Sequence, residues 1–251
     1  AVNDPEGFVW AILPHAARTF AACIALMPRR TVLPSAVAYL YCRMLDTYED
    51  LVPDRNAREA ALRASAERLS ATADRVGPAR PIEGATVQDE RDRAHLLLVK
   101  KAALVDQVFL TFDLETRTII KDLVTDMADG MCWSSSTFAA QGGVLANNAQ
   151  LAEYCHHVLG NPTVFGIRIL RYNYGLPTTL SAKEREDAML VGEFVQLANI
   201  TRDIEKDLMR RVAYDPALKA DLGRNSMDSG LRENIRAARV RLLRYALARA
   251  G

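Results

Sequence analysis

The stretch Tyr39-Leu-Tyr-Cys-Arg-Met-Leu-Asp-Thr-Tyr-Glu-Asp50 carries a polar stripe through a largely apolar run. Tyr39, Arg43, Asp46 and Asp50 are spaced four, three and four residues apart, which places them on one face of an α-helix. A polar stripe on a helix whose other faces are apolar must meet solvent, a partner or a ligand. The stretch therefore predicts a core helix with one functional face.

A second stretch, Gln196-Leu-Ala-Asn-Ile-Thr-Arg-Asp-Ile-Glu-Lys-Asp207, repeats this arrangement at intervals of three, four and four residues. Like charges four residues apart weaken a helix by roughly 0.2–0.5 kcal/mol, so two such pairs facing one cavity need cations between them. Carboxylate oxygens suit Mg²⁺, which takes substrate phosphates as further ligands. A solvent-facing side of a surface helix is the alternative for either stripe, and the occurrence of two stripes disfavours it. The pattern predicts a diphosphate held through magnesium by Asp46, Asp50, Asp203 and Asp207.

Helical periodicity extends over nearly the whole chain, and no alternating strand pattern competes with it. Ser181 and Glu184 have the spacing of a capping box at a helix start. Pro14 and Pro34 are expected to interrupt and to open a helix, respectively, and the Ser/Gly/Asn-rich residues 134–148 are expected to form a loop. No linker is long enough to divide domains, so we expect residues 1–251 to form a single all-α domain.

The composition excludes several classes of protein. The 251 residues are 49% hydrophobic, which disfavours disorder, and the formal charge of +1 argues against a nucleic-acid-binding protein. No apolar run reaches the ~18 residues of a membrane span, and no secretion signal is visible. The four cysteines show no CxxC or zinc spacing, so we expect reduced core cysteines in a cytoplasmic protein. The sequence indicates no oligomeric state.

The last predicted helix is amphipathic and rich in arginine. We expect a solvated outer face, with peripheral contact to an anionic membrane as the alternative. Its basic residues are Arg232, Arg236, Arg239, Arg241, Arg244 and Arg249, against one Glu233.

Five segments in order resemble the squalene/phytoene synthase family, the head-to-head trans-prenyltransferases. The two stretches above resemble the family's aspartate-rich motifs. Ala17-Arg-Thr-Phe20 is similar to its Ser-Arg-Ser/Thr-Phe signature, and Tyr154-Cys-His-His-Val-Leu-Gly160 to its Tyr-Cys-x-Tyr-Val-Ala-Gly segment. Met209-Arg-Arg-Val-Ala-Tyr-Asp-Pro216 loosely resembles the stretch that follows the second motif.

The resemblance implies an isoprenoid-synthase-type helical bundle around a central cavity. It implies Mg²⁺-dependent condensation of two prenyl diphosphates through a cyclopropyl diphosphate to squalene or a related product. Asp-Thr-x-Glu-Asp is nearer to the squalene synthases, which favours farnesyl diphosphate over a C20 substrate. The alternatives are a phytoene-type C20 synthase, a synthase that stops at the cyclopropyl diphosphate or its alcohol, and a non-catalytic relative of a mitochondrial assembly factor.

The same resemblance assigns roles to individual residues. Glu49 would assist the four aspartates at the metal. The implied catalytic residues are His157, Arg18, Arg43, Arg202 and Tyr39. The implied substrate-binding residues are Arg18, Tyr39, Arg43, Gln196, Asn199 and Arg202, with the arginines on the diphosphate.

The sequence also departs from the family pattern. His157 stands where the family has a tyrosine thought to assist proton removal; a packing role is the alternative. Ala17 replaces the usual serine. The family normally continues with further helices after Gly251, so we expect either an incomplete sequence or the absence of the NADPH-dependent reduction. Glu153 and His156 have the spacing of a di-iron ligand pair, but a second Glu-x-x-His is missing from the sequence.

Overall fold

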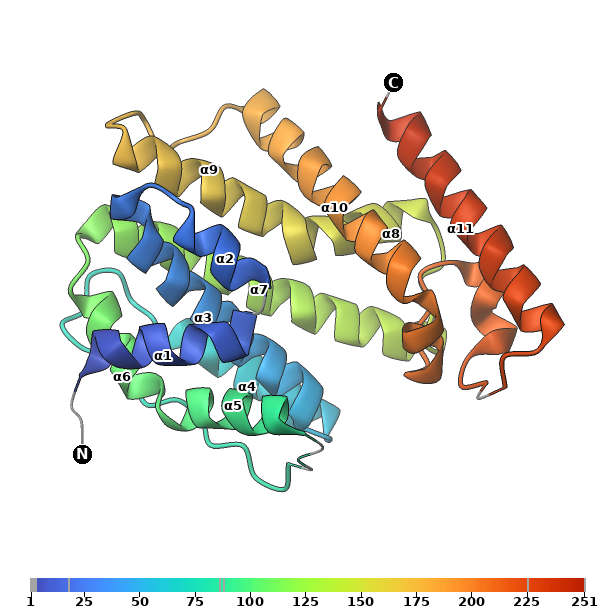
Figure 1. Ribbon diagram of the computed structural model, residues 1–251, viewed down its shortest axis with the longest axis horizontal. Helices are drawn as coiled ribbons and strands as arrows, with labels where there is room; N and C mark the ends of the chain where they lie inside the picture. Colours follow the sequence, from blue (N-terminus) through green and yellow to red (C-terminus); the bar gives the residue numbers. More distant parts are fainter. Residues whose placement is uncertain (1–3, 18, 86, 88, 225, 251) are drawn as a thin grey trace. The chain divides into compact units, whose positions relative to one another are not determined.

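The computed structural model describes residues 4–17, 19–85, 87, 89–224 and 226–250. Among these residues there is no β-strand, so the predicted all-α class is confirmed. The elements in order are α1 (Pro5–Ala17), α2 (Thr19–Ala25), α3 (Arg29–Leu51), α4 (Arg55–Glu67), α5 (Glu90–Lys100), α6 (Ala102–Leu110), α7 (Leu114–Gln141), α8 (Asn148–Cys155), the π-helical turn η1 (His156–Gly160), α9 (Asn161–Asn173), α10 (Ala182–Met209), the 3₁₀ helix η2 (Pro216–Asp221) and α11 (Ser229–Ala250) (Figure 1).

The chain divides into two compact units. The first unit comprises residues 1–132 and 165–180, and the second unit comprises residues 133–164 and 181–251. The first aspartate motif lies in the first unit and the second motif lies in the second unit. The single domain around a central cavity therefore stays a prediction.

Helix α3 is the centre of the first unit. It contacts α1, α2, α4, α5 and α6. Val37, Leu40 and Leu45 have no exposed surface and Tyr48 has 1%, so apolar burial covers the helix on every side except its polar stripe. This packing fixes the backbone that carries the first aspartate motif.

The second unit is built on α10 and α11, which lie side by side (Figure 1). Each contributes an apolar stripe with helical spacing, so the two stripes interlock in one core. The stripes consist of Leu197, Ile200, Ile204 and Leu208 on α10 and Leu231, Ile235, Ala238 and Leu242 on α11. The predicted capping box of Ser181 and Glu184 is confirmed at the start of α10.

Three local predictions were wrong. Pro14 lies inside α1 and Pro34 inside α3, because buried faces hold both helices together against the lost backbone hydrogen bond. Residues 134–141 continue α7 instead of forming a loop. The ring of Phe138 in this segment packs edge-on against Tyr154 and Tyr214, which gives the polar segment a place in the core.

The four cysteines form no disulfide, as expected. Cys132 and Cys155 are buried, and burial raises the pKa of the half-buried Cys42 to about 12. Cys23 is exposed, so its assignment to the core was wrong. Within the described ranges, no helix is long and apolar enough to cross a membrane.

A buried ion pair ties three parts of the first unit together. Arg68 Nη1 donates to Asp106 Oδ2 at 2.8 Å and to the Gly77 carbonyl at 2.9 Å. The Tyr41 hydroxyl donates to Asp106 Oδ1 at 2.9 Å. The Arg68 and Asp106 side chains are only 7% and 10% exposed, so either one alone would be a buried, uncompensated charge.

We predict that Asp106→Asn lowers the free energy of unfolding by about 3 kcal/mol, because it leaves the Arg68 guanidinium buried without its counter-charge. Asp129→Asn is the control. Asp129 lies 3.9 Å from Arg63 with both side chains more than half exposed, and its loss should cost less than about 0.5 kcal/mol. Urea unfolding monitored by circular dichroism measures the free energy of unfolding of both variants. Equal losses would contradict the structural role of the buried pair.

Candidate functional site

The first aspartate motif occupies the last turns of α3 and is held by a chain of hydrogen bonds. The Tyr39 hydroxyl donates to the Ala16 carbonyl at 3.4 Å and accepts from Arg43 Nη2 at 2.9 Å. Arg43 Nη1 lies 3.0 Å from Asp46 Oδ2. The three side chains stand on one helical face, as predicted, with the Arg43 and Asp46 side chains 23% and 31% exposed. Arg43 is therefore fixed in place before any ligand arrives.

The carboxylates of this motif are crowded. Burial raises the pKa of Asp46 to about 6, with Arg43 lowering it and Asp50 raising it further. Burial, Asp46 and Asp50 raise the pKa of Glu49 to about 8. Asp50 is exposed. Arg43 and Arg58 lower the pKa values of Asp46 and Glu49, respectively, but do not offset burial and the neighbouring carboxyl groups, so the motif favours a further cation.

Arg18, which the family resemblance assigns to the diphosphate, lies outside the described residues. Two residues that flank it in sequence contact the first motif. The Phe20 ring stacks on the Tyr39 ring with centroids 5.8 Å apart, and the Ala16 carbonyl accepts from Tyr39. The segment that resembles the family signature thus adjoins the first aspartate motif.

The second aspartate motif lies near the end of α10. Arg202 makes two hydrogen bonds to Asp203, Nε to Oδ1 at 3.0 Å and Nη2 to Oδ2 at 2.6 Å. Burial and the neighbouring Asp203 raise the pKa of Asp207 to about 6. In both motifs an arginine pairs with the first aspartate, while the second aspartate four residues later has no ion pair that the structure shows.

The remaining predicted residues of α10 lie on the same stripe. Asn199 Nδ2 donates to Gln196 Oε1 at 3.3 Å. The Gln196 side chain is buried and Asn199 is half-buried. The structure thus joins these two amides as neighbours within the second unit, and their contact with a substrate stays a prediction.

The donor set of each motif fits Mg²⁺. No group of three or more His, Cys, Asp or Glu side chains close enough to hold a metal occurs in the part of the chain that the structure describes. Magnesium is commonly bound through one or two carboxylates together with substrate phosphates and water, so a pair of aspartates is a sufficient protein contribution. The metal set of Asp46, Glu49, Asp50, Asp203 and Asp207 stays a prediction.

His157 lies in the π-helical turn η1. Its half-buried ring is 5.5 Å from the Trp133 ring, centroid to centroid, with the planes tilted by 45°. The turn inserts an extra residue into the helix that α8 begins and α9 continues. Such turns are rare and are frequent at functional sites.

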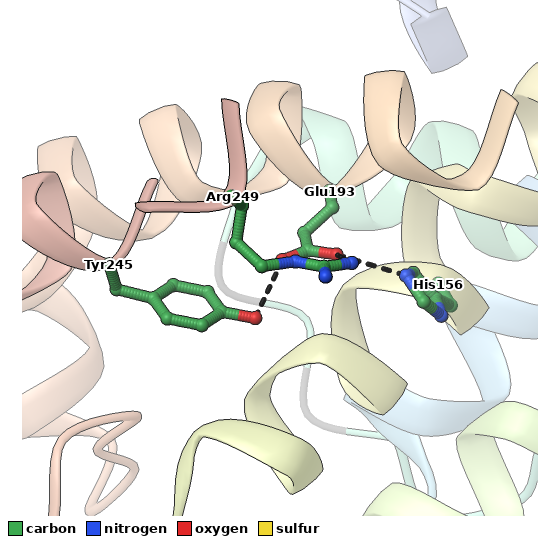
Figure 2. Close-up of polar contacts among 4 residues, drawn as sticks. All are labelled: His156, Glu193, Tyr245 and Arg249. Carbon is green, nitrogen blue, oxygen red and sulfur yellow. Dashed lines mark hydrogen bonds and ion pairs between the residues drawn. The ribbon is translucent and has the colours of Figure 1, made fainter. Parts of the chain in front are cut away.

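Sequence reasoning missed a cluster of four side chains that surrounds one buried carboxylate and includes the first residue of this turn (Figure 2). Glu193 of α10 has no exposed surface. Its carboxylate accepts from His156 Nε2 at 3.0 Å, from the Tyr245 hydroxyl at 2.6 Å, and from Arg249 at 3.3 and 3.4 Å. Burial alone would raise the pKa of Glu193, but the hydrogen bonds from Tyr245, Arg249 and His156 hold it below its ordinary value. The only signal in the sequence was an acidic residue three positions before Gln196 in an apolar run.

A second missed residue lies near the first motif. His95 of α5 is 6% exposed, and its Nε2 has no hydrogen-bond partner among the residues that the structure describes. Burial, Arg43 and Arg91 lower its pKa to about 4, so the ring is neutral at physiological pH. Helix α5 contacts α3, which places a neutral imidazole within the electrostatic reach of Arg43.

Two glycines allow η1 to lie directly on α10. A Cβ atom on Gly192 would stand 2.5 Å from the backbone of Leu159 and Gly160. A Cβ atom on Gly160 would stand 2.4 Å from the sulfur of Met189. The Gly192 contact is with backbone, which cannot turn aside as a side chain can. The backbones of the two elements therefore touch next to Glu193.

We predict that Gly192→Ala lowers the free energy of unfolding by about 2 kcal/mol, because the added methyl group forces the π-helical turn away from α10. Gly166→Ala in α9 is the matched control. A Cβ there meets nothing within 4 Å, and replacing a helical glycine should stabilise the protein by about 0.5–1 kcal/mol. Chemical unfolding measures the free energy of unfolding of both variants. A Gly192→Ala variant as stable as the wild-type protein would contradict the close approach.

Comparison with known proteins agrees with the motifs. A family model described as squalene/phytoene synthase matches residues 13–250. Lycopaoctaene synthase of Botryococcus braunii is 31% identical over 209 residues, which are 82% of this chain and 43% of that protein. Squalene synthase BSS of the same organism is 28% identical over 82% of this chain and 41% of its own length. A probable squalene synthase of Neurospora crassa is 27% identical over 85% and 42%. The chain thus spans about two fifths of the length of these relatives.

Solved structures show the same fold. The structure of TcSQS with the ligand E5700 is similar with a TM-score of 0.77 at 20% identity, covering 99% of this chain and 69% of that chain. The structure of TcSQS with BPH1237 is similar with a TM-score of 0.72 at 20% identity, covering 98% and 69%. At 20% identity, the similarity supports the fold alone.

Proposed function

This chain belongs to the squalene/phytoene synthase family, and we therefore propose that it condenses two prenyl diphosphates head to head. The observation that carries the proposal is the pair of Asp-x-x-x-Asp motifs, each with an arginine on its first aspartate, at 3.0 Å for Asp46 and 2.6 Å for Asp203. Paired carboxylates and guanidinium groups are the side chains that a diphosphate and its magnesium ions require.

In the proposed reaction, the first prenyl diphosphate loses its diphosphate and becomes an allylic cation. The double bond of the second prenyl diphosphate then forms a bond to that cation, and closure of the ring releases one proton to give a cyclopropyl diphosphate. Water must be kept away from the cation, and the apolar faces that flank both polar stripes suit that purpose.

Each predicted residue has a task in this scheme. Arg18, Arg43 and Arg202 bind the phosphate oxygens, and Tyr39 orients Arg43 through the hydrogen bond of 2.9 Å. Gln196 and Asn199 line the substrate on the face of α10, and His157 accepts the proton. Mg²⁺ bound by Asp46, Asp50, Asp203 and Asp207, with the help of Glu49, would supply charge stabilisation for the departing diphosphate.

Farnesyl diphosphate is the proposed substrate, from the likeness of the first motif to squalene synthases. The relatives leave a second product class to be tested, since one is a lycopaoctaene synthase and others are squalene synthases. The deciding assay incubates the protein with Mg²⁺ and farnesyl or geranylgeranyl diphosphate, with and without NADPH, and determines product masses. A cyclopropyl diphosphate or its alcohol would identify a synthase that stops before reduction. Absence of turnover with both substrates would favour the non-catalytic relative.

We predict that Asp46→Asn and Asp203→Asn each lower turnover by about a hundredfold or more, because each removes a carboxylate ligand of the magnesium that would stabilise the leaving diphosphate. Stability in metal-free buffer should hold or rise, since the substitution relieves repulsion between like charges. Asp187→Asn, at an exposed aspartate of the same α10 helix, is the control and should leave turnover unchanged. Near-normal turnover in both motif variants would exclude the proposed metal site.

We predict that prenyl diphosphate binding requires Mg²⁺ and that Arg202→Ala weakens it by about tenfold or more, as expected for the loss of hydrogen bonds to a charged group. Arg232→Ala is the matched control, because Arg232 is an exposed arginine of α11 remote in sequence from both motifs. Isothermal titration calorimetry with and without Mg²⁺ measures both effects. Equal affinity in the two buffers would count against a metal-bridged diphosphate.

A further inference from the structure

We propose that Glu193 is a positioning residue that fixes the π-helical turn carrying His157 and makes this turn depend on the docked end of α11. The catalytic part of this inference rests on the proposed function. The structural part, a turn held by a buried carboxylate, stands on the contacts of the second unit alone.

The carboxylate of Glu193 is fully buried, and both of its oxygens accept hydrogen bonds. Its Oε1 accepts from the Tyr245 hydroxyl at 2.6 Å and from Arg249 Nε at 3.3 Å. Its Oε2 accepts from His156 Nε2 at 3.0 Å and from Arg249 Nη2 at 3.4 Å. A buried charge of this kind persists only while its donors stay in place, so the cluster holds three elements at fixed positions (Figure 2).

One of these donors is the first residue of the turn. His156 begins η1, and His157 follows it directly. A carboxylate only accepts, so Nε2 is the protonated nitrogen of His156, and the hydrogen bond sets the rotation of the ring. Because the two histidines are adjacent in one tight turn, the anchor on His156 also fixes the direction in which His157 leaves the backbone.

The backbone contact supplies a second, independent constraint. Gly192, next to Glu193, lies against Leu159 and Gly160 at the other end of the turn. The turn is thus held on α10 at its first residue by a hydrogen bond and at its last residues by direct backbone packing. A π-helical turn is an uncommon conformation and persists where its surroundings determine it more than once.

Helix α11 completes the cluster from its last turns. Tyr245 and Arg249 are four residues apart, so both point from one face of α11 toward the same carboxylate. Arg249 brings the permanent positive charge of the cluster. If α11 undocks, Glu193 loses its hydrogen bonds from Tyr245 and Arg249 and retains the one from His156. The buried negative charge then loses most of its compensation. The shape of the turn is therefore coupled to the docking of α11.

The experiment uses Trp133 as a reporter of His157, since their rings are 5.5 Å apart. The chain has two tryptophans, so Trp10→Phe leaves Trp133 as the single emitter. In this background, Glu193→Gln should shift the Trp133 emission toward that of His157→Ala. Hydrogen exchange of residues 156–160 should accelerate by about tenfold or more. In the otherwise unmodified protein, kcat should fall by about tenfold to a hundredfold with KM within about twofold, as expected for a displaced catalytic group.

Arg241→Gln is the matched control. It breaks another ion pair of α11, the 2.7 Å contact with Asp215, without touching the turn. It should leave the Trp133 emission, the exchange of residues 156–160 and kcat unchanged. Equal effects of Glu193→Gln and Arg241→Gln on these three quantities would mean that Glu193 contributes only to general stability. That result would overturn the proposal.

If Glu193→Gln does not fold, Tyr245→Phe takes its place, because it removes only the donor at 2.6 Å. It should produce the same three changes with smaller size. Unchanged emission and exchange in a folded variant overturn the proposal whatever the activity. If the wild-type protein turns over no prenyl diphosphate, the proposed function fails, and the emission and exchange still decide whether Glu193 holds the turn.

Discussion

A carboxylate inside a helical core must meet donors of hydrogen bonds, and this requirement organises both units of the molecule. Asp106 meets Tyr41 and Arg68 in the first unit, and Glu193 meets His156, Tyr245 and Arg249 in the second. Each carboxylate joins helices that are distant in sequence. Apolar packing supplies the cohesion of these helices, and the buried acids determine which helix faces meet.

The two aspartate motifs follow the same requirement in different ways. Arg43 is bound by Asp46 and by Tyr39, and its guanidinium also lies 5.7 Å from the Tyr39 ring centroid. Arg202 contacts its neighbour Asp203, and its side chain is 68% exposed. The first arginine is therefore preorganised by its surroundings, whereas the second can change its rotamer at little cost.

The sequence predicted what local spacing determines. The stripes from Tyr39 to Asp50 and from Gln196 to Asp207 could be read because residues three and four apart share a helical face. Pro14 and residues 134–141 were misjudged because tertiary packing outweighed local preference there. The Glu193 cluster could not be read at all, since its donors lie 37, 52 and 56 positions away and only the packing of α11 brings them together. Whether the two aspartate pairs face one cavity depends on the same kind of long-range placement.

The distribution of the thiols has a practical consequence. Cys132 and Cys155 are buried, and the raised pKa of Cys42 keeps that thiol protonated, whereas Cys23 is exposed on α2. A thiol-directed reagent would therefore attach a spin label or fluorophore at a single position without any engineering of the chain. That position lies three residues after Phe20, whose ring stacks on Tyr39. A label on Cys23 would thus report on the surroundings of the first aspartate motif.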